Sequence, residues 1–191
     1  MPRPRCSFLI FLVLKGMIAV KAVEPITCRA TLERMKSHLR GRSERDYLIF
    51  RLGINLGFSI QQLLALRVEQ IRGATEMSIG ENSIEICESL QKELEAYLGD
   101  RTEGLLFPSR LGKPLTRHQV YIILKRTAEH VDLGQSVGVT TIRKTFAYWA
   151  YRQGTSLQTL RQYLNQSSVR KTREYIAVEE EPCGSFPAIS L

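Results

Sequence analysis

The sequence has little of what builds metal sites or disulfide frameworks. Its 191 residues contain three histidines that lie apart and four scattered cysteines, Cys6, Cys28, Cys87 and Cys183. No CxxC or close Cys/His spacing occurs, and zinc sites and small disulfide scaffolds depend on such spacing. We therefore predict no metal, no cofactor and a chain whose thiols are reduced.

A hydrophobic run long enough to cross a membrane is also missing. The apolar run Phe8–Leu14 follows Arg3 and Arg5, and it is too short for a membrane span. A basic start before an apolar run is typical of a signal peptide. The alternative is a start codon assigned too early, with Met17 as the true first residue. In either case we expect residues 1–19 to lie outside the domain, 20–178 to form it and 179–191 to be a loose tail.

Acidic residues are in deficit, because 27 Lys and Arg oppose 19 Asp and Glu and leave a net charge of +8. Such a surplus occurs on ordinary solvated surfaces, and also on proteins that bind nucleic acid or anionic membranes. Seven basic residues and one acidic residue lie between Thr140 and Tyr175, whereas eight acidic and two basic residues lie between Glu76 and Glu103. This separation favours a polyanionic partner, since a phosphate backbone would select the basic face.

What is present is mostly helical periodicity. Apolar spacing predicts helices over about 31–39, 44–56, 60–67, 89–98, 116–131, 140–153, 156–164 and 169–178. The expected N-caps are Thr31, Thr116, Thr140 or Thr141, and Ser156. Residues 77–79 and 83–86 alternate in the manner of strands around a turn at 80–82. The sequence thus predicts an α+β fold, mainly α-helical, with a small antiparallel β-hairpin at about 75–87.

Two residues have the chemistry to act on a phosphate. Arg143 is expected on the first turn of its helix, where unpaired backbone N–H groups and the helix dipole favour an anion. Tyr175 lies close to three cations, and a tyrosine hydroxyl acts as a nucleophile when cations stabilise the reacting group. Taken singly, however, such an arginine is most often a surface residue and such a tyrosine a packing residue.

Three segments in order resemble the tyrosine recombinase, or phage integrase, family. Residues 45–67, from Arg-Asp-Tyr-Leu to Leu-Ala-Leu-Arg, are similar to the first catalytic box. Thr140–Phe146 is similar to the second, which reads His-x-x-Arg-His or Lys. Leu164–Ile176 is similar to the last, Leu-Gly or Asn-His-Ser-Ser followed by the nucleophilic Tyr. The resemblance covers about residues 24–178 and is closest to short bacterial integrase-like proteins without a separate N-terminal DNA-clamping domain.

The resemblance implies the fold of the recombinase catalytic domain and site-specific breakage and rejoining of double-stranded DNA. Tyr175 would form a 3′-phosphotyrosyl link, and Arg143 would be one of two arginines that clamp the phosphate. The implied protein is bacterial and cytoplasmic and self-associates on DNA, with no membrane partner and no small-molecule substrate.

Several positions depart from the family pattern. Ser59 stands where the first clamp arginine is expected, Thr140 where the second box has histidine, and Gln166 where the last box has histidine or tryptophan. The hairpin 74–85 carries no lysine, although Arg72 lies just before it. We therefore predict an impaired site formed by Tyr175, Arg143, Lys144, Gln166, Thr140 and Ser59. The predicted DNA contacts are Arg72, Arg117, Arg161, Arg170, Lys171 and Arg173.

Three functions remain open at this point: an active recombinase with a rearranged site, a DNA-binding relative that does not cut and acts as an accessory or regulator, and a helical domain that binds something other than DNA. The basic stretch around Arg143 and Tyr175 argues against the third. Ser59 argues against efficient cleavage, because a missing clamp arginine is hard to replace.

Overall fold

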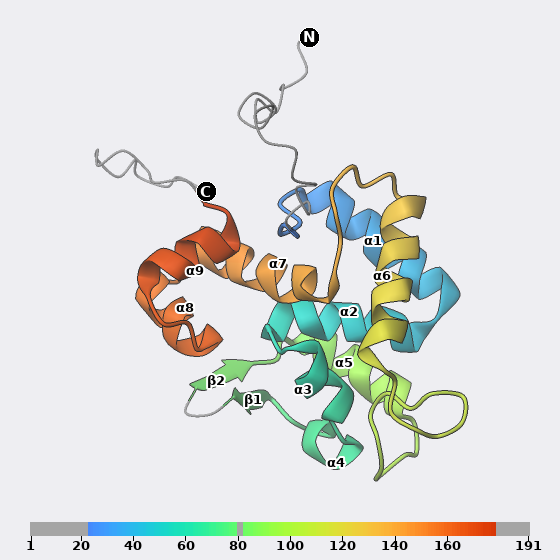
Figure 1. Cartoon of the computed structure of the whole chain (residues 1–191). Coiled ribbons are helices and arrows are strands. Elements are labelled where there is room, and N and C mark those ends of the chain that lie inside the picture. The colour runs from blue at the N-terminus through green and yellow to red at the C-terminus, as the bar shows by residue number, and fades with distance from the viewer. Residues whose placement is uncertain (1–22, 80–81, 179–191) are drawn as a thin grey trace.

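The computed structural model describes residues 23–79 and 82–178, and within them the chain forms nine helices and one two-stranded sheet. The elements are α1 (Arg29–Arg42), α2 (Glu44–Leu56), α3 (Ile60–Ala65), α4 (Val68–Ile71), β1 (Glu76–Ile79), β2 (Asn82–Glu85), α5 (Glu88–Leu98), α6 (Arg117–His130), α7 (Val139–Arg152), α8 (Leu157–Leu164) and α9 (Val169–Ile176) (Figure 1). This confirms the predicted mainly helical fold with a small hairpin. The expectations for residues 1–19 and 179–191 fall outside the described residues.

Several helices start where the sequence places a capping side chain. Thr116 Oγ1 accepts a hydrogen bond from the Gln119 amide at 3.2 Å, and Ser156 Oγ accepts one from the Thr159 amide at 3.0 Å, as predicted. The predicted caps of α1 and α7 are wrong, because α1 follows Cys28 and α7 follows Gly138.

The wrongly assigned cap residues lie inside the first turns of these two helices. Thr31 is 6% exposed and Thr141 is 1% exposed, so both pack into the protein, whereas Thr140, the other predicted cap of α7, is exposed but is already the second residue of the helix. Thr141 Oγ1 still accepts a hydrogen bond from the Gly138 amide at 3.0 Å. Both helices, α1 and α7, therefore begin before the threonines that local side-chain chemistry marks as their caps.

Helix α2 is the centre of the main core. It packs against α1, α5 and α7, and its apolar side chains, including Leu48, Leu52 and Leu56, are fully buried. At Gly53 the backbone of α2 touches α7, since a Cβ there would lie 2.2 Å from Cγ2 of Ile142. The absence of a side chain thus allows α7 to cross close to α2.

A second, smaller core joins the last three helices. Its buried members are Phe146, Ala147, Leu160, Tyr163, Leu164 and Ile176. These side chains hold α8 and α9 against α7, at the orange and red end of the chain in Figure 1. The position of Tyr175 relative to α7 depends on this cluster.

The segment before α1 packs along α7. Ile26 is 1% exposed, its amide donates to Thr145 Oγ1 at 2.9 Å, and its carbonyl accepts from Trp149 Nε1 at 3.0 Å. The carbonyl of Val23 accepts a hydrogen bond from Lys144 Nζ at 2.8 Å. This segment therefore stabilises the face of α7 that carries Lys144.

The predicted antiparallel hairpin is present, although Asn82, expected in the turn, belongs to β2 and pairs with Ile79. β1 and β2 are antiparallel, with Glu76 opposite Glu85 and Met77 opposite Ile84.

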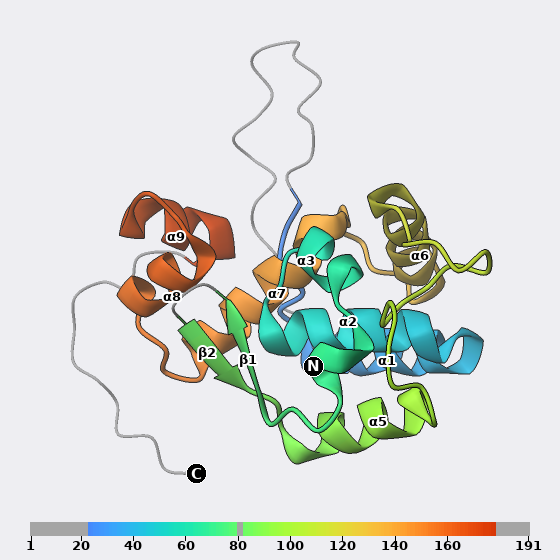
Figure 2. The same cartoon turned by 90° about the horizontal axis from the view of Figure 1, so that it is seen from below.

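Figure 2 shows α3, α6 and α9 toward one side of the molecule and α5 toward the other. No helix in the described part of the chain has the length and apolar character of a membrane span.

Candidate functional site

A pocket of about 170 Å³ lies where four helices meet, α3, α6, α7 and α9. Its lining brings together three residues of the predicted site that are far apart in the sequence, Ser59, Arg143 and Tyr175. The complete lining is Ser59, Ile60, Gln61, Arg117, Val139, Thr140, Arg143 and Tyr175. Four of the six predicted site residues, Thr140 included, thus border one cavity.

Arg143 is held in the wall of this pocket by backbone carbonyls. Its Nε donates to the Gly57 carbonyl at 2.9 Å, and one terminal nitrogen donates to the Tyr163 carbonyl at 3.5 Å. Carbonyls orient the guanidinium without neutralising it, and no carboxylate in residues 23–79 and 82–178 pairs with it. The half-buried side chain therefore presents an uncompensated positive charge, which favours an anion.

The placement of Arg143 on its helix differs from the prediction. Because α7 begins at Val139, Arg143 is the fifth residue of the helix and lies beyond the first turn. The helix end contributes through Val139 and Thr140, which line the pocket themselves. The carbonyls of Gly57 and Tyr163 orient Arg143, so its orientation does not depend on the unpaired amides at the start of α7.

Tyr175 lies beside two cations. Burial raises the pKa of its hydroxyl, and the nearby Arg143 charge opposes this rise. Lys144 Nζ lies 5.0 Å from the centre of the Tyr175 ring, and burial lowers the pKa of this lysine. At neutral pH the hydroxyl is therefore protonated, and Arg143 and Lys144 are the cations near this tyrosine.

Ser59 has a local role that explains a serine at this position. Its Oγ accepts a hydrogen bond from the Gln62 amide at 3.3 Å, and its own amide donates to Gln62 Oε1 at 2.8 Å. This reciprocal pair caps α3. The site gains a helix cap here and no charge.

The other two residues of the predicted site differ from each other in position. Thr140 is exposed and borders the pocket. Gln166 is half-buried and is not part of the pocket lining, and its carbonyl accepts a hydrogen bond from Arg161 at 3.5 Å. Thr140 can offer a hydroxyl to a bound anion, whereas Gln166 does not border the pocket.

The model of the Phage integrase family matches residues 29–181 of the sequence, which is most of the chain. The chain belongs to this family. Within it, the probable integrase/recombinase YoeC of Bacillus subtilis is 34% identical over 167 residues, covering 83% of this chain and 92% of YoeC. Tyrosine recombinase XerC of Caldanaerobacter subterraneus is 28% identical and covers 78% of this chain, but the match spans 47% of XerC. The chain thus corresponds to about half of the length of XerC.

Solved structures of recombinases share the fold. The crystal structure of XerA recombinase has a TM-score of 0.68 and 18% identity, and the match covers 83% of this chain and 61% of XerA. XerH site-specific recombinase bound to palindromic difH substrate has a TM-score of 0.64 and 17% identity, covering 88% of this chain and 52% of XerH. At these identities the likeness establishes the fold of the phage integrase catalytic domain, which confirms the predicted fold class.

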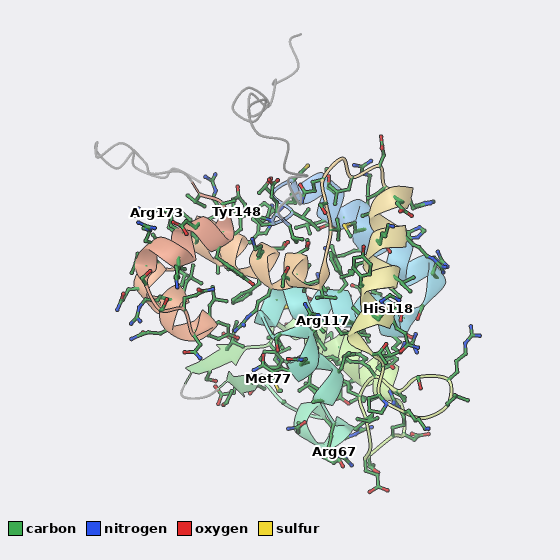
Figure 3. All side chains as sticks on the ribbon, in the orientation of Figure 1. Arg67, Met77, Arg117, His118, Tyr148 and Arg173 are labelled. Carbon is green, nitrogen blue, oxygen red and sulfur yellow. The ribbon has the colours of Figure 1, made fainter. Side chains whose placement is uncertain are left out.

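The predicted DNA contacts of this family member are dispersed. Arg117 lines the pocket, whereas Arg72 is held elsewhere, with Nη2 donating to the carbonyls of Gly99 and Arg101 at 2.6 Å. Arg170 forms an ion pair with Glu174 at 3.1 Å. Figure 3 labels Arg117 at the start of α6 and Arg173 on α9, at separate places on the molecule.

The remaining predicted contacts lie on α8 and α9. Arg161 on α8 is half-buried and donates to Gln158 Oε1 at 3.3 Å. Lys171 on α9 is exposed, and Arg173 is half-buried. Sequence reasoning singled out Arg117 as a DNA contact but missed its place in the pocket. The available signal was its position directly after the cap Thr116, at the start of a long helix.

Proposed function

We propose that this phage integrase family member binds double-stranded DNA and places one backbone phosphate in the pocket between Arg143 and Tyr175, with strand cleavage impaired. The convergence of three family boxes on one pocket supports the proposal most strongly, because Ser59, Thr140, Arg143 and Tyr175 come from segments up to 116 positions apart in the sequence (175 minus 59). The anion on which this family acts is a phosphodiester of the DNA backbone.

The proposed reaction is a transesterification. The Tyr175 hydroxyl oxygen attacks the phosphorus, a bond forms between them, and the bond from phosphorus to the 5′ oxygen breaks. The phenol proton is lost and the departing 5′ oxygen gains one, so protons and charge balance without an added reactant. The product is a 3′-phosphotyrosyl link and a 5′ hydroxyl, and the reverse step rejoins the strand. Such a transfer relies on positioning and on stabilisation of the phosphate charge.

Impairment follows from the charges that are absent. Removal of one donor that stabilises a developing anion typically costs a factor of about 10² to 10³ in rate. Ser59 caps α3 and brings no charge, and the hairpin sequence 74–85 contains no lysine. Thr140 brings only a hydroxyl. The alternative function is therefore an accessory or regulatory protein that binds DNA without cutting it, and Ser59 is the observation that favours it.

A covalent-adduct assay tests the proposal. The full chain is incubated with overlapping duplexes that carry the DNA flanking its gene, each nicked at intervals to trap cleaved ends, and adducts are resolved on a denaturing gel. We expect a trace of adduct that Tyr175→Phe abolishes and that Tyr151→Phe, a matched change on α7 away from the pocket lining, does not. Efficient cleavage by the unmodified chain would contradict the impairment, and adduct that persists in Tyr175→Phe would contradict the role of Tyr175.

Self-association on DNA is part of the same proposal, because rejoining a cut strand to a different DNA partner requires two DNA sites to be held together. Sedimentation of the chain with and without a duplex that it binds tests this step. We expect a higher stoichiometry on DNA than in its absence.

A further inference from the structure

The pocket contains a second arginine that the family pattern does not place there. Arg117 comes from the start of α6, 58 positions after Ser59 (117 minus 59), and it lines the same cavity as Ser59, Arg143 and Tyr175. Ser59 is the position at which the family pattern expects a clamp arginine. A residue from another helix thus borders the space in which a cation is missing.

The cap of α6 fixes the backbone position of Arg117 but leaves its guanidinium available. Thr116 and Gln119 form a reciprocal cap that sets the first turn of α6, with bonds of 2.8 and 3.2 Å. Arg117 is the first residue of this helix, and Figure 3 shows it labelled between α3 and the start of α7. Its side chain is exposed, and the residues that the structure describes offer its guanidinium no hydrogen bond or ion pair. Arg143, by contrast, is anchored on two carbonyls.

The other nearby cations are engaged or lie elsewhere. Arg72 donates hydrogen bonds to the carbonyls of Gly99 and Arg101, which follow α5, and its Nη1 lies 3.6 Å from Glu95 Oε2. It is not part of the pocket lining. Lys144 donates to the Val23 carbonyl and faces the ring of Tyr175. Among the described residues, Arg117 and Arg143 are the two arginines of the pocket lining.

We propose that Arg117 replaces the missing first clamp arginine and, together with Arg143, binds the phosphate that Tyr175 faces. This inference rests on the proposed function. A guanidinium offers five donors in a planar fork, and two such forks from different helices match a phosphate better than one. The first residues of α6 and α7, Arg117 and Val139, both border the pocket, so the positive ends of two 14-residue helices add to its potential.

The first test measures binding of inorganic phosphate to the full chain. Arginine Nε–Hε signals are followed by NMR in the unmodified protein, and the substitutions Arg117→Lys and Arg143→Lys serve only to assign them. We expect the signals of Arg117 and Arg143 to shift together with one dissociation constant. Signals assigned through Arg117→Lys and Arg143→Lys that respond at different concentrations, or no response at Arg117, would overturn the inference.

Substitutions make the same test quantitative. Arg117→Gln should weaken phosphate binding by about tenfold or more, since a hydrogen bond to a charged group is lost. Arg126→Gln is the matched control: it lies on the same helix, is exposed and removes the same charge outside the pocket lining. We expect its effect to stay within about twofold, because distant exposed charges are screened.

A double-substitution cycle separates a shared phosphate from an independent DNA contact. Ser59→Arg restores a cation at the family position, and Ser59→Ala controls for the lost helix cap. If Arg117 performs the same task, Arg117→Gln should weaken phosphate binding much less in the Ser59→Arg chain than in the unmodified one. Equal losses in both chains would mean that Arg117 contacts something else, and the inference would be wrong.

Failure of the inference and failure of the proposed function give different results. If Arg143→Gln weakens phosphate binding and Arg117→Gln does not, the pocket binds phosphate but Arg117 is not part of the clamp. If neither substitution weakens binding, the pocket is not a phosphate site and both proposals are wrong. Thermal unfolding of each variant identifies any that lose binding because they fail to fold.

Discussion

Gly57 is the residue at which the end of α2 meets the ring of Phe146. Its φ is +64°, and a Cβ there would lie 2.2 Å from Phe146 Cδ1. Gly57→Ala should therefore cost about 1–2 kcal/mol for the left-handed backbone and about 1–3 kcal/mol for overpacking. We expect urea denaturation to show a loss near the sum of the two.

Gly73→Ala is the control for this prediction. Gly73 has a similar φ of +68° but no atom within 4 Å of the added Cβ. It should therefore lose only the backbone contribution, about 1–2 kcal/mol. Equal losses at the two glycines would show that contact with Phe146 does not matter.

Four buried or half-buried tyrosines predict how stability responds to alkaline pH. Burial raises the pKa of Tyr47, Tyr97, Tyr163 and Tyr175 above the ordinary value, so the folded state holds these protons more tightly than the unfolded chain does. Their contribution to stability is present below pH about 10 and is lost as pH rises through the folded pKa values. Two groups act in the opposite sense: burial lowers the pKa of Lys144, and a hydrogen bond with Thr31 lowers the pKa of the Cys28 thiol.

Urea denaturation between pH 8 and pH 11 measures this effect. We expect the free energy of unfolding to fall above pH about 10. The decline should be shallower in Tyr163→Phe, because that tyrosine is buried against the Leu56 carbonyl. Stability that rises across this range would contradict the prediction.

At the level of elements, the segment before α1 is expected to hold α7 in place. Ile26 is 1% exposed and shares hydrogen bonds with Thr145 and Trp149. Ile26→Ala should cost about 2–5 kcal/mol, the usual range for such a truncation in a core. The neighbouring Thr27 is exposed, and Thr27→Ala should change stability by less than about 0.5 kcal/mol. Chemical denaturation of both variants checks the difference, and similar effects would show that the segment does not pack as described.

At the level of the whole molecule, the basic helices α7 to α9 predict salt-dependent binding to duplex DNA of any sequence. The logarithm of the affinity should fall with the logarithm of salt concentration by about 0.9 per phosphate contacted. Lys171→Glu should weaken binding and lower this slope, because Lys171 is exposed on α9. Fluorescence anisotropy with a labelled duplex measures both quantities.

Lys92→Glu is the control for this prediction. Lys92 is 75% exposed and pairs with Glu88 on α5, which lies away from α9 in Figure 2. The same change of charge there should leave the affinity within about twofold, because the site is distant and screened. A flat salt response in the unmodified chain would contradict DNA binding by phosphate neutralisation.

The predictions from sequence succeeded where the cause is local. The hairpin follows from residue alternation, and the starts of α6 and α8 follow from Thr116 and Ser156, whose side chains bond to amides three residues later. They failed at α1 and α7, where Thr31 and Thr141 are buried. Burial by distant segments is a tertiary effect, and local spacing does not encode it.

The element types, the three family boxes and the absence of a charge at Ser59 follow from the sequence alone, because each depends on neighbouring residues or on residue identity. That Arg117 borders the pocket and Arg72 does not becomes visible only in the folded protein. The physical reason is the close crossing of α7 over α2 at Gly53 and Gly57. This crossing places the start of α7 beside α3, the packing of α6 on α1 and α7 adds Arg117, and no local pattern specifies either.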